Sequence, residues 1–256
     1  MNTSSFYRYL VGGLACFAAL LCFTSVYAAA ENKLSEPEER EALKVDVDDM
    51  LQPWKGDLPG MLDRRTIRVL TTFSKTFFFI NKGTQRGATH DIFMEFERSL
   101  NQSLAKEKKL KHRHLKVRII FVPVARDQLI SALNAGKGDI IAANLTITPA
   151  RQQEMTFTAP IYSHVQELLL SGPGSPKVEN LQQLSGKTVF VRTSSSYYES
   201  LVALNARFAQ QSLPPITLTP APEALEDEDL IEMLSAGLIP LTVVDRHKAL
   251  FWKQVF

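Results

Sequence analysis

The polar residues that could bind a small anion lie directly after an apolar run at residues 140–143. Asn144 offers an amide, and Thr146 and Thr148 offer hydroxyls. Arg151 adds a planar guanidinium whose paired donors suit a carboxylate. Ligands of open α/β sheets bind just beyond the carboxyl ends of the strands. The run therefore predicts a buried strand followed by an anion-binding loop.

A helix pattern precedes this strand and recurs 101 positions further along the chain. Residues 129–136 and 230–237 agree at five positions, with apolar side chains at helical spacing and a final glycine. Asn144 at the first strand tip corresponds to Asp245 in the second copy. The repeat favours two similar α/β lobes that face each other, and chance similarity of two helix–strand units is the alternative. Arg151 would then bind a carboxylate and Asp245 an ammonium, the two charges of an α-amino acid.

Two further segments offer ligand contacts. The loop after the expected first strand is rich in phenylalanine, and Phe78 within it would either stack on a ligand or pack in the core. Four hydroxyl residues at 193–196 precede an expected helix at 197–208. Ser195 and Ser196 among them would either bind an anion or cap the helix.

Two sets of strands and helices are expected to position these residues. For a first lobe at 63–160 the patterns predict strands at 66–72, 117–122 and 140–143 and helices at 91–104 and 129–136. For a second lobe at 161–256 they predict strands at 165–170, 188–191 and 241–244 and helices at 197–208 and 230–237. Strands that alternate with helices in this way indicate an α/β fold.

Composition excludes several classes of function. A chain of 256 residues is long enough for two lobes, and its hydrophobic content of 45% is that of a globular protein. The net charge of +2 is too small to indicate nucleic-acid binding. Both cysteines, Cys16 and Cys22, lie in an apolar amino-terminal stretch, so thiol catalysis and cysteine metal sites are excluded from the body. We expect no cofactor.

A basic run at residues 106–116 contains His112 and His114. These histidines are poor candidates for metal ligands because no cluster of carboxylates accompanies them, so we expect no metal site. The run would be a solvated helix end, or it would contact an anionic surface such as peptidoglycan or a membrane.

The amino terminus has the pattern of a targeting segment. One arginine precedes an apolar stretch at 10–26, and small residues follow it near Ala28 and Ala30. Residues 1–30 are thus expected to be a cleaved signal peptide or a retained membrane anchor, which predicts a periplasmic protein that is free or attached to a membrane. The polar, acidic residues 31–62 are expected to be a linker.

The sequence at 138–162, with Asn-Leu-Thr-Ile-Thr-Pro-Ala-Arg at its centre, resembles the family 3 periplasmic solute-binding proteins. The resemblance extends over residues 64–256 and implies a two-lobed α/β fold of the type II periplasmic-binding-protein class. It also implies binding of an amino acid or a related solute. The segment at 72–79 lacks the acidic residue or tyrosine that the family often has there, so the preferred ligand side chain stays open.

The resemblance assigns roles to individual residues. It implies that Arg151 holds the ligand α-carboxylate and that Asn144 and Thr146 donate hydrogen bonds to the ligand. Ser195 and Ser196 would complete the carboxylate site. Asp245 would hold the ligand ammonium.

The chain also resembles the amino-terminal module of the membrane-bound lytic transglycosylases F, which precedes a domain that cleaves peptidoglycan. That resemblance implies a regulatory or targeting role, and no catalytic residue falls within this chain. The alternative is a receptor of an amino-acid ABC transporter. Because the family's fold returns to the first lobe after the second, the fold is expected to be incomplete at its carboxyl end. A weaker alternative is catalysis by the module itself, for which Asp245 and Glu167 are the available acids.

Overall fold

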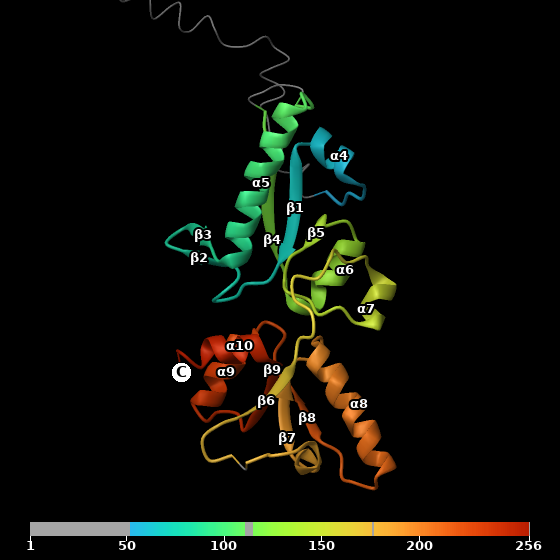
Figure 1. The fold of residues 1–256 in the computed structure, drawn as a ribbon, viewed down its shortest axis with the longest axis vertical. Coiled ribbons are helices and arrows are strands. Elements are labelled where there is room, and N and C mark those ends of the chain that lie inside the picture. The colour runs from blue at the N-terminus through green and yellow to red at the C-terminus, as the bar shows by residue number, and fades with distance from the viewer. Residues whose placement is uncertain (1–51, 111–114, 176, 256) are drawn as a thin grey trace, which may run out of the picture. The chain divides into compact units, whose positions relative to one another are not determined.

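The computed structural model describes residues 52–110, 115–175 and 177–255. The expected targeting segment, most of the expected linker, and both His112 and His114 lie outside these residues. Within the described residues, no helix combines the length and the apolar character needed to cross a membrane. They form two α/β lobes, each built around its own main sheet (Figure 1).

The first sheet has three parallel strands in the order β4-β1-β5. β1 (Thr66–Thr71) lies in the centre and is buried along its whole length. β4 (Arg118–Pro123) pairs with it over six residues, and β5 (Ile140–Ile141) pairs with it over two. A parallel strand with neighbours on both sides is buried on both faces. Ile67 and Val69 pack in one apolar cluster and Leu70 in another, while the buried Arg68 pairs with Asp139.

Helices flank this sheet, with α5 on one side and α6 on the other (Figure 1). The elements are α4 (Leu58–Asp63), α5 (Ala88–Lys106), η1 (Arg126–Gln128), α6 (Leu129–Asn134), α7 (Pro149–Glu154), and a hairpin of β2 (Phe79–Asn81) with β3 (Thr84–Arg86). α4 comes from the end of the expected linker, and its Met61 is buried in the core beside β1. The chain therefore joins the fold before β1 begins.

The second sheet has four strands in the order β6-β9-β7-β8. They are β6 (Glu167–Ser171), β7 (Thr188–Val191), β8 (Thr217–Pro220) and β9 (Leu241–Asp245). β6 runs antiparallel to β9, and the other pairs are parallel. A short 3-10 helix, η2 (Leu181–Leu184), precedes β7.

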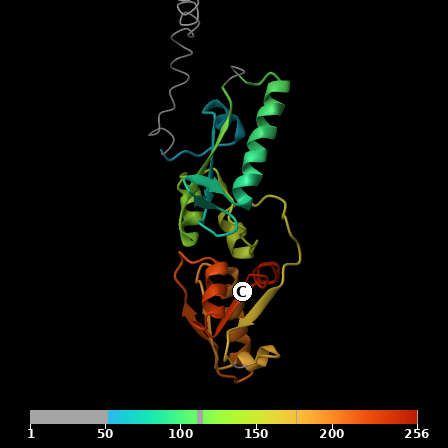
Figure 2. The same cartoon turned by 90° about the vertical axis from the view of Figure 1, so that its left-hand side faces the viewer.

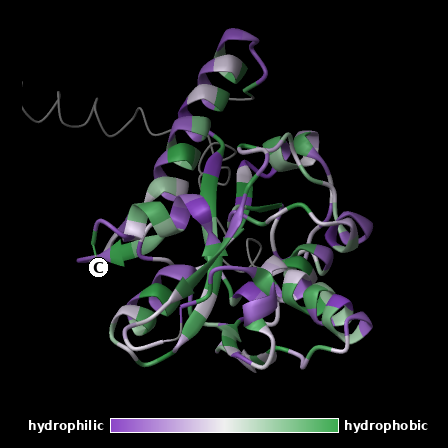
Figure 3. Cartoon of the chain, turned by 60° about the horizontal axis from the view of Figure 1, so that its bottom comes forward, coloured by the Kyte–Doolittle hydropathy of each residue, from purple (hydrophilic) through white to green (hydrophobic). Residues whose placement is uncertain are grey.

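Helices also cover the second sheet. α8 (Ser196–Gln210) packs on one face, and α9 (Asp227–Ser235) and α10 (Arg246–Trp252) pack on the other, as Figures 1 and 2 show. The side chains of β9 alternate between the two faces of the sheet. Leu241 and Val243 pack with α8, and Val244 packs with α9 and α10. Figure 3 shows hydrophobic residues along the strands and polar residues on the outer surfaces of helices.

The predicted repeat is present in the structure. A glycine with positive φ lies two residues after the end of each of α6 and α9, Gly136 (+73°) and Gly237 (+74°), and a strand of the sheet follows each. Gly138 then allows close packing on β1, because a Cβ atom there would lie 2.3 Å from Leu70 Cγ.

β5 is shorter than predicted from the apolar run at 140–143. The backbone N–H of Ala142 still donates to the Leu70 carbonyl. The carbonyls of Ala142 and Ala143, however, accept hydrogen bonds from side chains. Thr71 Oγ1 donates to the Ala142 carbonyl (2.9 Å), and Arg126 Nη1 donates to the Ala143 carbonyl (3.0 Å). These side-chain partners replace a strand neighbour and begin the polar loop two residues early.

Candidate functional site

Arg151 lies on α7 and is buried, with 7% of the residue exposed. Nη1 donates to the Thr146 carbonyl and Nη2 to the Ser194 carbonyl, each at 2.8 Å. It therefore joins the loop after β5 to the loop after β7. Among the described residues, no carboxylate forms an ion pair with Arg151.

The surroundings of Arg151 do not neutralise its charge. Burial lowers the pKa of the guanidinium, Glu199 acts against this, and Arg126 and Arg192 lower the pKa further. An arginine stays protonated at neutral pH in spite of such a shift. A buried cation of this kind favours the arrival of an anion.

The structure brings three more of the predicted residues close to Arg151. Ser196 Oγ donates to Thr146 Oγ1 at 3.2 Å, so a hydroxyl from each lobe meets here. Ser195 is the N-cap of α8, where its Oγ accepts from the Tyr198 N–H (3.2 Å) and donates to the Arg192 carbonyl (2.7 Å). Ser195 therefore has the capping role that was the alternative to anion binding.

Asn144 and Phe78 are placed differently from each other. Asn144 is exposed and has positive φ (49°), which suits a turn at a strand tip. Phe78 is 1% exposed and packs in the core of the first lobe against Phe121. Of the two interpretations of Phe78, the structure favours core packing, and Phe73 beside it is the aromatic that is 55% exposed.

Asp245 ends β9 and is buried, but its carboxylate has an internal partner. The Lys248 ammonium lies 3.2 Å from Asp245 Oδ2. The Asp245 backbone N–H donates to the Tyr197 hydroxyl at 3.1 Å. The Lys248 ammonium thus pairs with the Asp245 carboxylate, to which the resemblance assigns the ammonium of a ligand.

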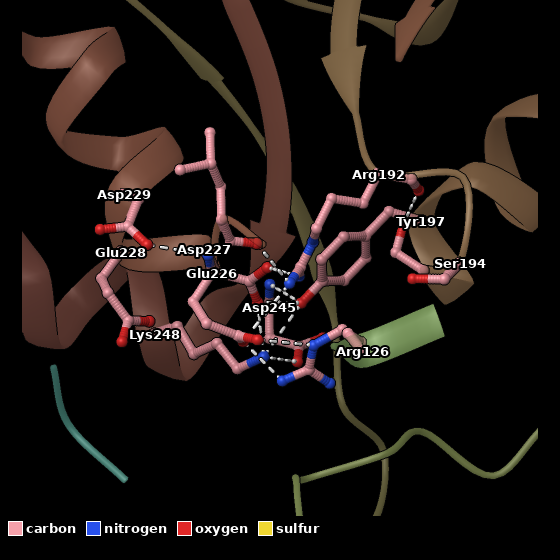
Figure 4. Close-up of polar contacts among 12 residues, drawn as sticks. Arg126, Arg192, Ser194, Tyr197, Glu226, Asp227, Glu228, Asp229, Asp245 and Lys248 are labelled. Carbon is pink, nitrogen blue, oxygen red and sulfur yellow. Dashed lines mark hydrogen bonds and ion pairs between the residues drawn. The ribbon is translucent and has the colours of Figure 1, made fainter. Parts of the chain in front are cut away.

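Asp245 belongs to a buried cluster of charges that sequence reasoning missed (Figure 4). Asp227 pairs with Arg192 and with Lys248 Nζ (2.5 Å), and it accepts from the Tyr197 hydroxyl (2.9 Å). We call this set the charge cluster; its members are Arg126, Arg192, Tyr197, Glu226, Asp227, Asp245 and Lys248. The acidic residues that begin α9 also favour the helix macrodipole, so their sequence alone does not indicate these ion pairs.

A sequence signal for the cluster did exist. Arg192 follows β7 directly and Arg126 follows β4 by three residues, so both lie just beyond the carboxyl ends of strands. The same rule drew attention to Arg151.

At neutral pH, Asp227 in the cluster is ionised and Tyr197 is neutral. Burial acts to raise the pKa of Asp227, but Lys248 and Arg192 lower it well below the usual range of an aspartate. Burial and the charges of Asp227 and Asp245 raise the pKa of Tyr197, so its hydroxyl stays neutral.

The first turns of α9 also contact the first lobe. Glu226 accepts two hydrogen bonds from Arg126, from Nε at 3.0 Å and from Nη2 at 2.5 Å. Ser74 Oγ donates to Glu228 at 2.6 Å, and Lys75 pairs with Asp229 at 2.9 Å and with Glu232. We refer to these as the α9 contacts. They tie the loop after β1 and η1 to the second lobe.

A family model for bacterial extracellular solute-binding proteins, family 3, matches residues 77–238, which is more than half of the chain. The chain belongs to this family. The matched residues include the Arg151 loop, α8 and the acidic start of α9.

Curated relatives of this solute-binding protein are membrane-bound lytic murein transglycosylases F. The one from Shewanella pealeana is 34% identical over 118 residues, which cover 46% of this chain and 23% of the relative. The one from Desulfosudis oleivorans is 30% identical over 190 residues, or 74% of this chain and 37% of the relative. The chain thus matches between 23% and 37% of the length of these relatives.

Solved structures confirm the predicted α/β periplasmic-binding-protein fold. The arginine-binding protein ArgBP from T. maritima matches with a TM-score of 0.56 at 20% identity, over 77% of each chain. An ancestral arginine-binding protein bound to arginine matches with a TM-score of 0.52 at 24% identity, over 74% of each chain.

Proposed function

We propose that this solute-binding domain holds a small carboxylate between its two lobes, with the Arg151 guanidinium as the carboxylate contact. The observation that carries the proposal is the burial of Arg151 with only backbone carbonyls as partners among the described residues. The solved neighbours named for arginine and glutamine support a ligand of amino-acid size.

Neighbouring residues have supporting roles in this proposal. The hydroxyls of Thr146 and Ser196 bind the carboxylate beside Arg151, and Ser195 orients the start of α8. Asn144 and Phe73, both exposed, contact the rest of the ligand. Asp245 acts together with Lys248 and not alone.

In its biological setting, the domain is proposed to be the regulatory or targeting part of a peptidoglycan lytic transglycosylase in the periplasm. Residues 1–30 would direct it there, residues 31–62 would connect it, and its lobes would meet near residue 160. The names of the curated relatives support this role. A receptor of an amino-acid ABC transporter is the second candidate, which the amino-acid-binding structural neighbours favour.

Substituting Arg151 with methionine tests the binding site. Loss of one partner of a buried charge pair weakens binding by about 2–5 kcal/mol, so affinity should fall at least about thirtyfold. The probes are a panel of free amino acids and other small carboxylates, screened by thermal shift and then measured by calorimetry. Arg207→Met on the exposed side of α8 is the matched control and should bind as the wild type does. Equal affinity in Arg151→Met would overturn the site assignment.

Deleting the encoding gene separates the two biological roles. Cells that lack a regulatory module should release fewer soluble peptidoglycan fragments and should take up labelled amino acids normally. Only the wild-type gene, and not the Arg151→Met variant, should restore the release. Reduced amino-acid uptake with unchanged fragment release would support the transporter receptor instead.

A further inference from the structure

Glu223 lies in the loop between β8 and α9, and its carboxylate accepts three hydrogen bonds from the loop after β7. Oε1 accepts from Thr193 Oγ1 at 2.8 Å and from the Ser194 backbone N–H at 3.1 Å. Oε2 accepts from Ser194 Oγ at 2.5 Å. An ionised carboxylate offers acceptors on both oxygens and no donor, so it suits these three donors better than a neutral amide does.

The pKa of Glu223 agrees with this arrangement. Burial acts to raise the pKa, but the hydrogen bonds from Ser194 and Thr193 and the charge of Arg192 lower it below the usual value of a glutamate. Glu223 is therefore ionised at neutral pH.

The loop that carries Glu223 is fixed on both sides of it. β7 and β8 are neighbouring parallel strands, so their loops leave the same edge of the second sheet. The Ala221 N–H donates to the Val191 carbonyl at 3.0 Å, and Arg192 Nη1 donates to the Leu225 carbonyl at 2.9 Å. Glu223 thus gives the loop after β7 a fixed partner.

The residue that Glu223 holds is also the one that Arg151 contacts. Arg151 Nη2 donates to the Ser194 carbonyl, and Nη1 donates to the Thr146 carbonyl, each at 2.8 Å. One of these carbonyls belongs to each lobe, and together they orient the guanidinium. Glu223 binds the N–H and the hydroxyl of Ser194, so its effect reaches Arg151 through the carbonyl of that residue.

We propose that Glu223 is a positioning residue, which sets the orientation of the Arg151 guanidinium through Ser194. This inference rests on the proposed carboxylate site at Arg151. A guanidinium that two fixed carbonyls already orient loses less freedom when a carboxylate binds, so Glu223 raises the affinity without touching the ligand.

Nuclear magnetic resonance of the chain with 15N-labelled arginine tests the positioning without any ligand. The Arg151 signals are those missing from the spectrum of Arg151→Met. Hydrogen bonds to two carbonyls slow the rotation about the Nε–Cζ bond that exchanges Nη1 with Nη2, so the wild type should show two separate Nη signals. In Glu223→Ala the exchange should be at least about tenfold faster, and the two signals should merge. Glu223→Gln keeps one acceptor oxygen and should give an intermediate rate, so it carries the test if the alanine variant folds poorly.

Calorimetry then measures the effect on binding, with L-arginine and L-glutamine as the probes. Glu223→Ala should lower the affinity of the probe that binds by about tenfold, because the ligand must then orient Arg151 itself. Glu179→Ala, at an exposed position before η2, is the matched control and should resemble the wild type in both measurements.

The outcomes separate this inference from the proposed function. Nη signals that are merged already in the wild type, or that stay separate in both folded Glu223 variants, overturn the inference. Merged signals with unchanged affinity overturn it as well. If the signals merge in Glu223→Ala but neither probe binds the wild type, or Arg151→Met binds as the wild type does, the positioning of Arg151 stands and the site for an amino-acid carboxylate is overturned.

Discussion

Replacing Asp227 by alanine is expected to lower the free energy of unfolding by about 3–5 kcal/mol. The side chain is 2% exposed and contacts Arg192, Lys248 and the Tyr197 hydroxyl. Its removal takes away one of the two carboxylate partners of each buried cation, since Arg192 keeps Glu226 and Lys248 keeps Asp245. Desolvation makes the loss of a partner costly for a buried charge. Urea denaturation followed by circular dichroism measures the change.

The matched control is Glu232→Ala, on the exposed face of the same helix. Its ion pair with Lys75 lies at the surface, so the variant should lose at most about 1 kcal/mol. A loss in Asp227→Ala as small as that in the control would show that the charge cluster contributes little to stability.

Acid should reveal the same contact in the wild type. Burial acts to raise the pKa of Asp227, but Lys248 and Arg192 lower it, so the folded pKa lies below the unfolded value of about 3.9. A group of this kind stabilises the fold above about pH 4, and the contribution is lost as pH falls through the folded pKa. Asp227→Ala should therefore flatten the fall of stability below about pH 4, and an unchanged acid profile would contradict the ion pair.

Replacing Asp139 by alanine should destabilise the first lobe to a similar extent, by about 3–5 kcal/mol. The Asp139 carboxylate, whose side chain is 1% exposed, pairs with Arg64 and Arg68 and accepts from the Arg68 backbone N–H at 2.7 Å. The Arg68 guanidinium also donates to the carbonyls of Gln52 and Gly136, at 2.8 Å each. Loss of the carboxylate thus leaves charge buried beneath β1. Chemical denaturation of the variant gives the free energy.

Asp63→Ala, at the exposed end of α4, is the control for this experiment and should stay within about 0.5 kcal/mol of the wild type. The double variant Arg68→Met with Asp139→Leu replaces both charges by apolar groups. It should recover part of the loss, since the cost comes from the unpaired charge. A double variant that is less stable than Asp139→Ala would contradict this explanation.

Local patterns predicted most strands of the two main sheets and the longer helices, but not the hairpin of β2 and β3, the strand β8 or the short helices α4 and α7. The apolar spacing before Gly136 and Gly237 predicted α6 and α9, because a helix that packs on one side must repeat its apolar residues at 3.6-residue intervals. A run rich in β-branched residues predicted β1, and a mainly apolar run predicted β9. Arg151 was found because polar loops follow such strands.

Contacts between distant segments were not predictable in this way. Asp227 and Arg192 are 35 positions apart, and Glu226 and Arg126 are 100 apart, so no local pattern records their pairing. An acidic run at the start of a helix has the same sequence whether its carboxylates face water or pair with arginines. Phe78 illustrates the same limit, because only the packing of Phe121 against it separates a core aromatic from a ligand contact.

The α9 contacts have a consequence for how tightly a solute can bind. When two lobes must come together around a ligand, the measured affinity is the intrinsic affinity multiplied by the fraction of molecules already in the competent arrangement. Here Arg126 with Glu226 and Ser74 with Glu228 contribute to that arrangement through the chain's own side chains. A ligand then supplies less of the closing free energy itself. Even a small molecule that makes few contacts can then bind tightly. Substitutions on α9, far from Arg151, should therefore change the affinity for the ligand.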